Sequence, residues 1–197
     1  MDSSLLLLCV DTLPTGRWLV LGGLSQERPW KDACHVKEYT LVVVDMQPDF
    51  PASNNPATLR AVEREVRKAI KHRLPVVVLE IPYFSPLDED GLKPTHRSIM
   101  RLLTGYDHYR VVQKRWSDGS SHVILTCEDS KYMKHRFRIC GVNTDACVLE
   151  TVLGLAKRLP KCKIRVIKNA CNTVFSSDCW DKFLVAPNVK LKRGKNL

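Results

Sequence analysis

The hydrophobic pattern of the chain is irregular up to about residue 37 and becomes regular from Tyr39 onward. The run YTLVVVD at 39–45 is continuously apolar and β-branched, which predicts a strand buried on both faces. Further strands of this kind are predicted at 75–81, 109–114, 137–142, 163–170 and, more briefly, 188–193.

Two segments between these strands carry a helical pattern. Asn55 and Pro56 offer an N-cap followed by proline at the first helical position, and apolar residues then recur at steps of three and four until Pro75. A second helix is predicted from about Asp145 to Leu159, with its apolar residues on one stripe. The segment between Lys114 and the fourth strand shows no clear helical stripe.

Strands that alternate with helices pair in parallel through right-handed crossovers. The sequence therefore predicts an α/β fold of Rossmann type, a three-layer sandwich whose six-stranded, mostly parallel sheet has helices on both faces. We expect one domain over residues 38–197, and residues 1–37 form an N-terminal extension to which the sequence assigns no role. Active sites in such sheets lie beyond the carboxyl ends of the strands, near the point where strand order reverses.

Composition places the chain among soluble globular proteins, with 44% hydrophobic and 26% charged residues in a length of 197. The early apolar run Leu5–Val10 follows Asp2 without a basic residue and is short for a signal peptide. No run approaches the roughly 18 apolar residues of a membrane span. We therefore expect a cytoplasmic protein that does not bind membranes and whose cysteines are mostly reduced and buried.

The net charge of +10 can attract anionic substrates or nucleic acid. The basic residues are spread over several segments, and no helix-turn-helix, zinc-finger or aromatic-rich RNA-binding signature accompanies them. This pattern favours an ordinary solvated surface over a nucleic-acid partner. The eight cysteines include no C-x-x-C pair, so a structural zinc site is not expected.

Three reactive residue types stand at predicted strand ends. Asp45 closes the first strand, Lys114 closes the third, and Cys147 lies just past the fourth, where a helix begins. Each has an ordinary explanation by itself: a capping carboxylate, a surface lysine or a small buried thiol. An acid, an amine and a thiol at one edge of a sheet nevertheless form a plausible nucleophilic site.

The segments VVVDMQPDF, VVQKRWS and CGVNTDACVLETV, which contain these residues, occur in the order of three signature blocks of the isochorismatase-like cysteine hydrolases. The chain resembles this superfamily, which includes nicotinamidases, amidohydrolases acting on ureidoacrylate and carbamoylsarcosine, and true isochorismatases. The resemblance runs from Tyr39 to the last strand, and the cysteine block is its most specific part.

The resemblance implies a catalytic triad of Asp45, Lys114 and Cys147, with the main-chain amides of Asn143 and Cys147 as oxyanion donors. It also implies a cis peptide bond between Val142 and Asn143. Asp45 would act as general base and then as general acid. The helix start and the Lys114 ammonium are both expected to lower the thiol pKa and to favour thiolate.

Retention of the cysteine indicates cleavage of a C–N bond in a small amide, ureide or carbamoyl compound through a thioester. Nicotinamidases carry an Asp-x-His pair after the second strand, which this sequence lacks, so nicotinamidase activity is disfavoured. Asp88, Asp90 and His96 carry side chains that can bind a metal, but acidic residues in a loop are usually just solvated, and we expect no metal or other cofactor. True isochorismatases commonly replace the cysteine, which disfavours that reaction too.

Phe50, Trp116 and Ala146 are the predicted walls of the substrate pocket, although Phe50 is equally well explained as a core residue. Pro48 stands where the family usually has asparagine, and RWSDGSS follows Lys114 in place of a Ser-Ala-Phe run. We expect a small-molecule substrate and a homo-oligomer. The competing hypothesis is a catalytically inactive binding protein on the same fold, with an anionic or nucleic-acid partner.

Overall fold

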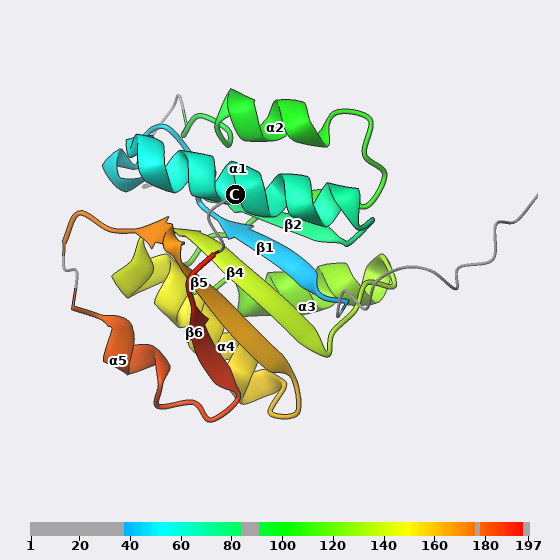
Figure 1. Cartoon of the computed structure of the whole chain (residues 1–197), viewed down its shortest axis with the longest axis vertical. Coiled ribbons are helices and arrows are strands. Elements are labelled where there is room, and N and C mark those ends of the chain that lie inside the picture. The colour runs from blue at the N-terminus through cyan, green and yellow to red at the C-terminus, as the bar shows by residue number, and fades with distance from the viewer. Residues whose placement is uncertain (1–37, 84–90, 176–177, 195–197) are drawn as a thin grey trace, which may run out of the picture. The chain divides into compact units, whose positions relative to one another are not determined.

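The computed structural model describes residues 38–83, 91–175 and 178–194, so the division of the chain at residue 37 stays a prediction. Six parallel strands form one sheet in the order β3-β2-β1-β4-β5-β6, which confirms the predicted α/β fold (Figure 1). The strands are β1 Thr40–Val44, β2 Val76–Glu80, β3 Tyr109–Gln113, β4 Arg136–Val142, β5 Lys163–Asn172 and β6 Val189–Lys192.

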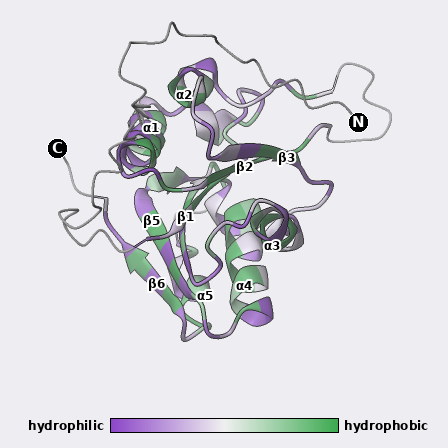
Figure 2. Ribbon diagram, turned by 90° about the vertical axis from the view of Figure 1, so that its right-hand side faces the viewer, coloured by the Kyte–Doolittle hydropathy of each residue, from purple (hydrophilic) through white to green (hydrophobic). Residues whose placement is uncertain are grey.

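Helices cover both faces of this sheet (Figure 2). One core cluster joins α1 and α2 to the sheet, and a second joins α3, α4 and α5 to the opposite face. The helices are α1 Pro56–Lys71, α2 Arg97–Leu103, α3 Ser120–Asp129, α4 Leu149–Arg158 and α5 Trp180–Phe183, with a 3-10 turn at Pro51–Asn54 and a π-helical turn at Thr144–Val148.

The central strand β1 contributes to both cores. Leu41 and Val43 pack toward α1, whereas Val42 and Val44 pack toward α4, because successive side chains of a strand point to opposite faces. All five residues of β1 are buried. The unbroken apolar run that predicted this strand follows from burial on both sides.

The predicted first helix is confirmed as α1. The side chain of Asn55 accepts hydrogen bonds from the amides of Ala57 and Thr58, at 3.0 and 3.1 Å. Pro56 occupies the first turn, where its missing N–H leaves no bond unmade. The helix ends at Lys71, followed by Arg73 in the left-handed region with φ of 53°.

Three helices have no counterpart in the sequence prediction. The segment after Lys114, which showed no helical stripe, contains the ten-residue helix α3. Only Ser120, Val123 and Cys127 of α3 are buried, so its apolar stripe is too narrow to stand out. The helices α2 and α5 have seven and four residues, too few for a periodic pattern to emerge.

The strand order reverses between β1 and β4. From β1 the chain proceeds outward to β2 and β3, and it then returns to β4 beside β1 before it proceeds to β5 and β6 on the other side. The carboxyl ends of β1 and β4 are therefore the edges at which a site is expected in such a sheet. Asp45 directly follows β1, and Asn143 directly follows β4.

No helix in the described ranges is long and apolar enough to cross a membrane.

Candidate active site

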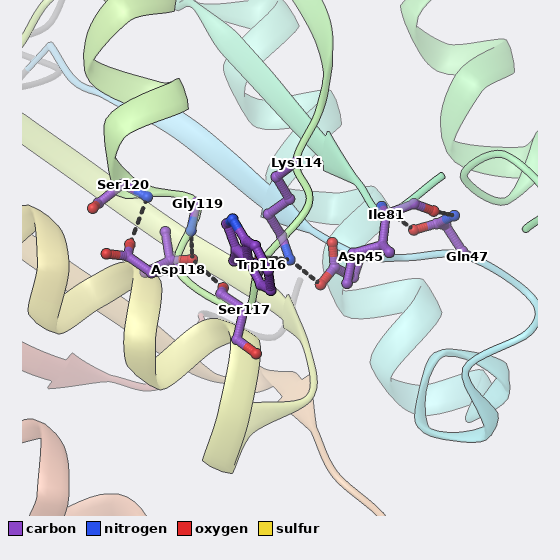
Figure 3. Close-up of polar contacts among 10 residues, drawn as sticks. Asp45, Gln47, Ile81, Lys114, Trp116, Ser117, Asp118, Gly119 and Ser120 are labelled. Carbon is purple, nitrogen blue, oxygen red and sulfur yellow. Dashed lines mark hydrogen bonds and ion pairs between the residues drawn. The ribbon is translucent and has the colours of Figure 1, made fainter. Parts of the chain in front are cut away.

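Asp45 and Lys114 form a fully buried ion pair at the carboxyl edge of the sheet (Figure 3). The Nζ atom of Lys114 lies 2.8 Å from Oδ2 of Asp45, and both side chains are 0% exposed. Lys114 Nζ also donates a hydrogen bond to the carbonyl of Trp116, at 3.1 Å. Because an isolated buried charge costs several kcal/mol, each member of the pair requires the other.

The main chain of β2 fixes both residues. The amide of Asp45 donates to the carbonyl of Leu79 at 3.0 Å, and the amide of Lys114 donates to the neighbouring carbonyl of Glu80 at 2.8 Å. Asp45 has φ of 48°, an unusual value for a non-glycine residue. The pair is therefore built on rigid strand ends.

Cys147 lies in the π-helical turn Thr144–Val148 that joins β4 to α4. This placement confirms a helix starting near Asp145, although its first turn is π rather than α. The amides of Ala146 and Val148 donate to the carbonyl of Asn143 at 3.2 and 3.0 Å. Cys147 is 6% exposed and packs in the core cluster on the α4 side of the sheet.

The end of β4 approaches β1 closely at Gly141. A Cβ atom added there would lie 2.0 Å from the carbonyl oxygen of Val44, and φ of Gly141 is 127°. Only glycine permits this contact. It brings the turn with Cys147 up to the residue that follows Val44, which is Asp45.

The peptide bond between Val142 and Asn143 is cis, as the family resemblance implied. Asn143 and Cys147 both belong to the turn that follows this bond. The role of their amides as oxyanion donors stays a prediction.

The thiol of Cys147 is harder to ionise than the sequence analysis predicted. Burial and the adjacent Asp45 carboxylate raise the pKa of Cys147 to about 12, and they outweigh Lys114 and Ser117, which act in the opposite direction. The predicted lowering of the thiol pKa is therefore wrong for the resting site. The thiol stays protonated at neutral pH and needs a base.

Asp45 is the base within reach. Burial raises the pKa of Asp45 above its ordinary 3.8, while Lys114 and Cys147 oppose that increase. A carboxylate with a raised pKa accepts a proton more readily, and the nearby thiol has one to give. The arrangement therefore suits transfer of the thiol proton to Asp45 when a nucleophile is required.

The three predicted pocket residues lie in different environments. Trp116 follows Lys114 in the chain and is 75% exposed, whereas Phe50 is 7% exposed and belongs to the core cluster on the α1 side. Ala146 is half-buried in the turn just before Cys147. Trp116 and Ala146 flank the reactive residues along the chain, and the core contacts of Phe50 agree with its structural explanation.

Two acidic or amide side chains of the site were given no role in the sequence analysis. Gln47 is 1% exposed and binds the main chain of Ile81 in both directions, each at 2.8 Å, and the carbonyl of Lys93 at 2.9 Å. Glu80 ends β2 and accepts a hydrogen bond from the amide of Thr95 at 2.7 Å. Both side chains hold the segment after β2 in place through hydrogen bonds to its main chain. The position of Gln47 two residues after Asp45 was the sequence signal that could have indicated its role.

A further side chain joins the loop after Lys114 to the helix after Cys147. Thr151 Oγ1 accepts a hydrogen bond from the amide of Gly119 at 3.0 Å and donates to the carbonyl of Ser117 at 3.3 Å. Thr151 is 0% exposed. Its position one turn after Cys147 was a signal that the sequence analysis did not use.

Of the possible metal ligands Asp88, Asp90 and His96, the structure describes only His96. His96 Nε2 lies 3.0 Å from Oγ of Ser53, and burial lowers the pKa of His96. Asp88 and Asp90 lie outside the described residues. In the described part of the chain, no group of three or more His, Cys, Asp or Glu side chains is arranged to hold a metal ion.

Comparison with known families agrees with this geometry. Residues 39–186 match the isochorismatase domain family, and this range includes all three reactive residues. The chain belongs to the isochorismatase family. No curated protein is significantly similar to it in sequence.

Solved structures of isochorismatase-like proteins share the fold. N-carbamoylsarcosine amidase from Thermoplasma acidophilum superimposes with a TM-score of 0.66 and 18% identity, over 81% of this chain and 98% of that one. For a nicotinamidase from Staphylococcus aureus the TM-score is 0.65 with 16% identity, over 80% and 98%. For the MAR1 ribonuclease from Caenorhabditis elegans it is 0.64 with 19% identity, over 79% and 77%. The TM-scores show a common fold, and at such low identities they leave the substrate open.

Proposed function

We propose that this isochorismatase-family protein is a cysteine hydrolase that cleaves a C–N bond in a small amide, ureide or carbamoyl compound. The observation that carries the proposal is the buried Asp45–Lys114 ion pair, which lies against the thiol of Cys147. Core packing does not require a buried ion pair next to a thiol, since apolar residues of similar volume are often as stable. The amidases among the structural neighbours support the choice of reaction.

In the first step Asp45 removes the thiol proton, and the sulfur attacks the carbonyl carbon of the substrate. Lys114 stabilises the negative charge that passes from the carboxylate to the sulfur. The C=O bond becomes a single bond whose oxygen carries a negative charge. The amides of Asn143 and Cys147 are the donors proposed to stabilise that charge.

In the second step the tetrahedral intermediate collapses to a thioester on Cys147. The C–N bond breaks, and the proton held by Asp45 passes to the departing nitrogen, which leaves as ammonia or an amine. A water molecule, deprotonated by Asp45, then attacks the thioester carbonyl carbon. The carbon–sulfur bond breaks, the acid product leaves, and the thiol regains its proton.

A release assay across a panel of small amides, ureides and carbamoyl compounds tests the proposal directly. We expect ammonia or amine release from at least one class with the unaltered protein and a loss of at least 1,000-fold in Cys147→Ala. Cys127→Ala is the matched control, because Cys127 is also a buried thiol but lies on α3. Full activity in Cys147→Ala, or equal losses in both variants, would exclude the thioester mechanism.

A further inference from the structure

The solvent side of α1 carries a straight row of cations. Arg60, Arg64, Arg67 and Lys71 follow one another at intervals of four, three and four residues. At 3.6 residues per turn they fall within a sector of about 60°, and the row is about 16 Å long. This sector lies opposite the side of the helix that carries the buried residues Ala61, Val62, Glu65, Val66 and Ala69.

Among the described residues, few acidic groups offset this row. Glu63 is the nearest, with a side chain 16% exposed and 3.5 Å from Arg67, and Glu65 is turned inward to Arg138. Arg60, Arg64 and Lys71 have no ion-pair partner among the described residues.

The neighbouring helix α2 extends the same charge. It packs beside α1 on the same face of the sheet (Figures 1 and 2). Its exposed charged residues are Arg97 and Arg101. In α1 the exposed charged residues are Arg60, Arg67 and Lys71, and Glu63 and Arg64 are both half-buried. The exposed charges of the two neighbouring helices are therefore all positive.

Helix stability does not account for the row. A cation favours the helix macrodipole only within the last turn, which explains Lys71 but neither Arg60 nor Arg64. Arg60 and Arg64 are the fifth and ninth residues of α1, outside the last turn in which a cation gains from the macrodipole. Neither arginine has an ion-pair partner among the described residues, so both are available to an external anion.

We propose that the α1–α2 face binds the sugar–phosphate backbone of a nucleic acid strand, independently of the hydrolase chemistry. A row of about 16 Å spans roughly five phosphates of one strand at about 3.4 Å each. Binding of this kind does not depend on base sequence, because only base-edge contacts carry sequence information. In the sequence, the spread of basic residues over several segments favoured an ordinary solvated surface. The alignment of four basic residues along α1 changes that interpretation.

Two other occupants fit the face less well. An anionic membrane surface is usually bound with apolar side chains beside the cations, yet the large apolar residues that the described chain exposes all lie outside α1 and α2. A second copy of the chain would bring the same positive sign to the contact. A phosphodiester strand requires only the cations that are present.

Fluorescence anisotropy with a 20-nucleotide single-stranded RNA and a 20-base-pair DNA duplex tests the proposal between 50 and 200 mM salt. Four phosphate contacts predict a log–log salt slope of about −3, which is roughly a 50-fold loss of affinity over this range. The variant Arg60→Gln, Arg64→Gln, Arg67→Gln, Lys71→Gln should bind at least tenfold more weakly at 50 mM and lose most of the slope. Its hydrolase activity should be unchanged, because α1 and Cys147 pack on opposite faces of the sheet.

A charge-matched control separates the row from net charge. Lys157, Lys161, Lys163 and Lys190 are exposed outside α1 and α2, and their replacement by glutamine removes the same four charges. This control should keep most of the affinity and slope. Equal losses in both variants, no binding of either nucleic acid at 50 mM, or row-dependent binding to phosphatidylserine vesicles without nucleic-acid binding would each overturn the proposal.

Discussion

The ammonium of Lys114 lies 2.8 Å from the carboxylate of Asp45, and neither side chain is exposed to solvent. The two residues follow β1 and β3, which are separated in the sheet by β2. The long lysine side chain therefore crosses the end of β2 to reach the carboxylate, and the adjacent carbonyls of Leu79 and Glu80 fix both main chains. The ion pair thus fixes the proposed base at the carboxyl edge of the sheet.

Replacing one member of this ion pair should destabilise the protein more than replacing both. Lys114→Met leaves the Asp45 carboxylate buried without a partner and should lower the free energy of unfolding by about 3–5 kcal/mol. The double variant Asp45→Asn, Lys114→Met should recover most of that loss and remain inactive. Denaturant unfolding and the release assay together check this, and additive losses in the double variant would contradict it.

Removing Asp45 should make Cys147 more reactive toward alkylation, although hydrolysis is lost. The Asp45 carboxylate is, after burial, the main cause that raises the thiol pKa, and its neutralisation leaves only burial to oppose the lowering effect of Lys114. Burial still raises the pKa of Cys147 in Asp45→Asn, but one of the two opposing causes is gone. The pH at which iodoacetamide alkylates Cys147 should therefore shift below about 12, the value in the resting site. Mass spectrometry of the labelled peptide measures the shift.

Cys127 provides an internal reference in the same experiment. Burial raises the pKa of Cys127 to about 11, and Asp45 is not among the groups that affect it. Its alkylation profile should be the same in both proteins. A Cys147 profile that stays in place, or moves upward, would show that Asp45 does not control the thiol.

Activity should disappear at acidic pH through protonation of Asp45. Because burial raises the pKa of Asp45, the base is lost as pH falls through a value above 3.8. The acid limb of kcat/KM should therefore have its midpoint above 3.8, the ordinary pKa of an aspartate. A pH profile with circular dichroism at each point separates titration from unfolding, and a limb at or below 3.8 would argue against Asp45 as the base.

The sequence predicted the sheet, and the placing of Asp45 and Lys114 at its carboxyl edge, better than the electrostatics of the thiol. Burial on both faces leaves a continuous apolar run in β1, and a helix as long as α1 has a clear period. The crossing of Lys114 over β2 and the contacts of Thr151 join residues far apart in the chain, so no local pattern indicates them. The predicted direction of the pKa shift of Cys147 was wrong. Desolvation depends on how deeply the thiol is buried, and the motif around Cys147 does not indicate that.

Thr151 should support catalysis by positioning the loop after Lys114. Thr151→Val removes both hydrogen bonds and leaves the buried amide of Gly119 unpaired, a loss of about 1–3 kcal/mol in stability. We expect kcat to fall about tenfold with little change in KM, since the side chain touches the loop and not the substrate. Thr151→Ser keeps the hydroxyl and should restore kcat, and failure of this rescue would show that the lost methyl packing matters instead.

The close contact between Gly141 and Val44 should be indispensable for folding. In Gly141→Ala the new Cβ would meet the Val44 carbonyl oxygen at 2.0 Å, so β4 must separate from β1 near Asp45. The expected loss is at least 3 kcal/mol in the free energy of unfolding, because the clash adds to the strain of φ at 127°.

Gly105→Ala is the matched control, since φ there is 76° but no atom lies within 4 Å of the added Cβ. Its smaller loss, about 1 kcal/mol, would reflect φ alone. Equal losses in both variants, measured by denaturant unfolding, would mean that backbone conformation and not the β1–β4 contact decides the effect.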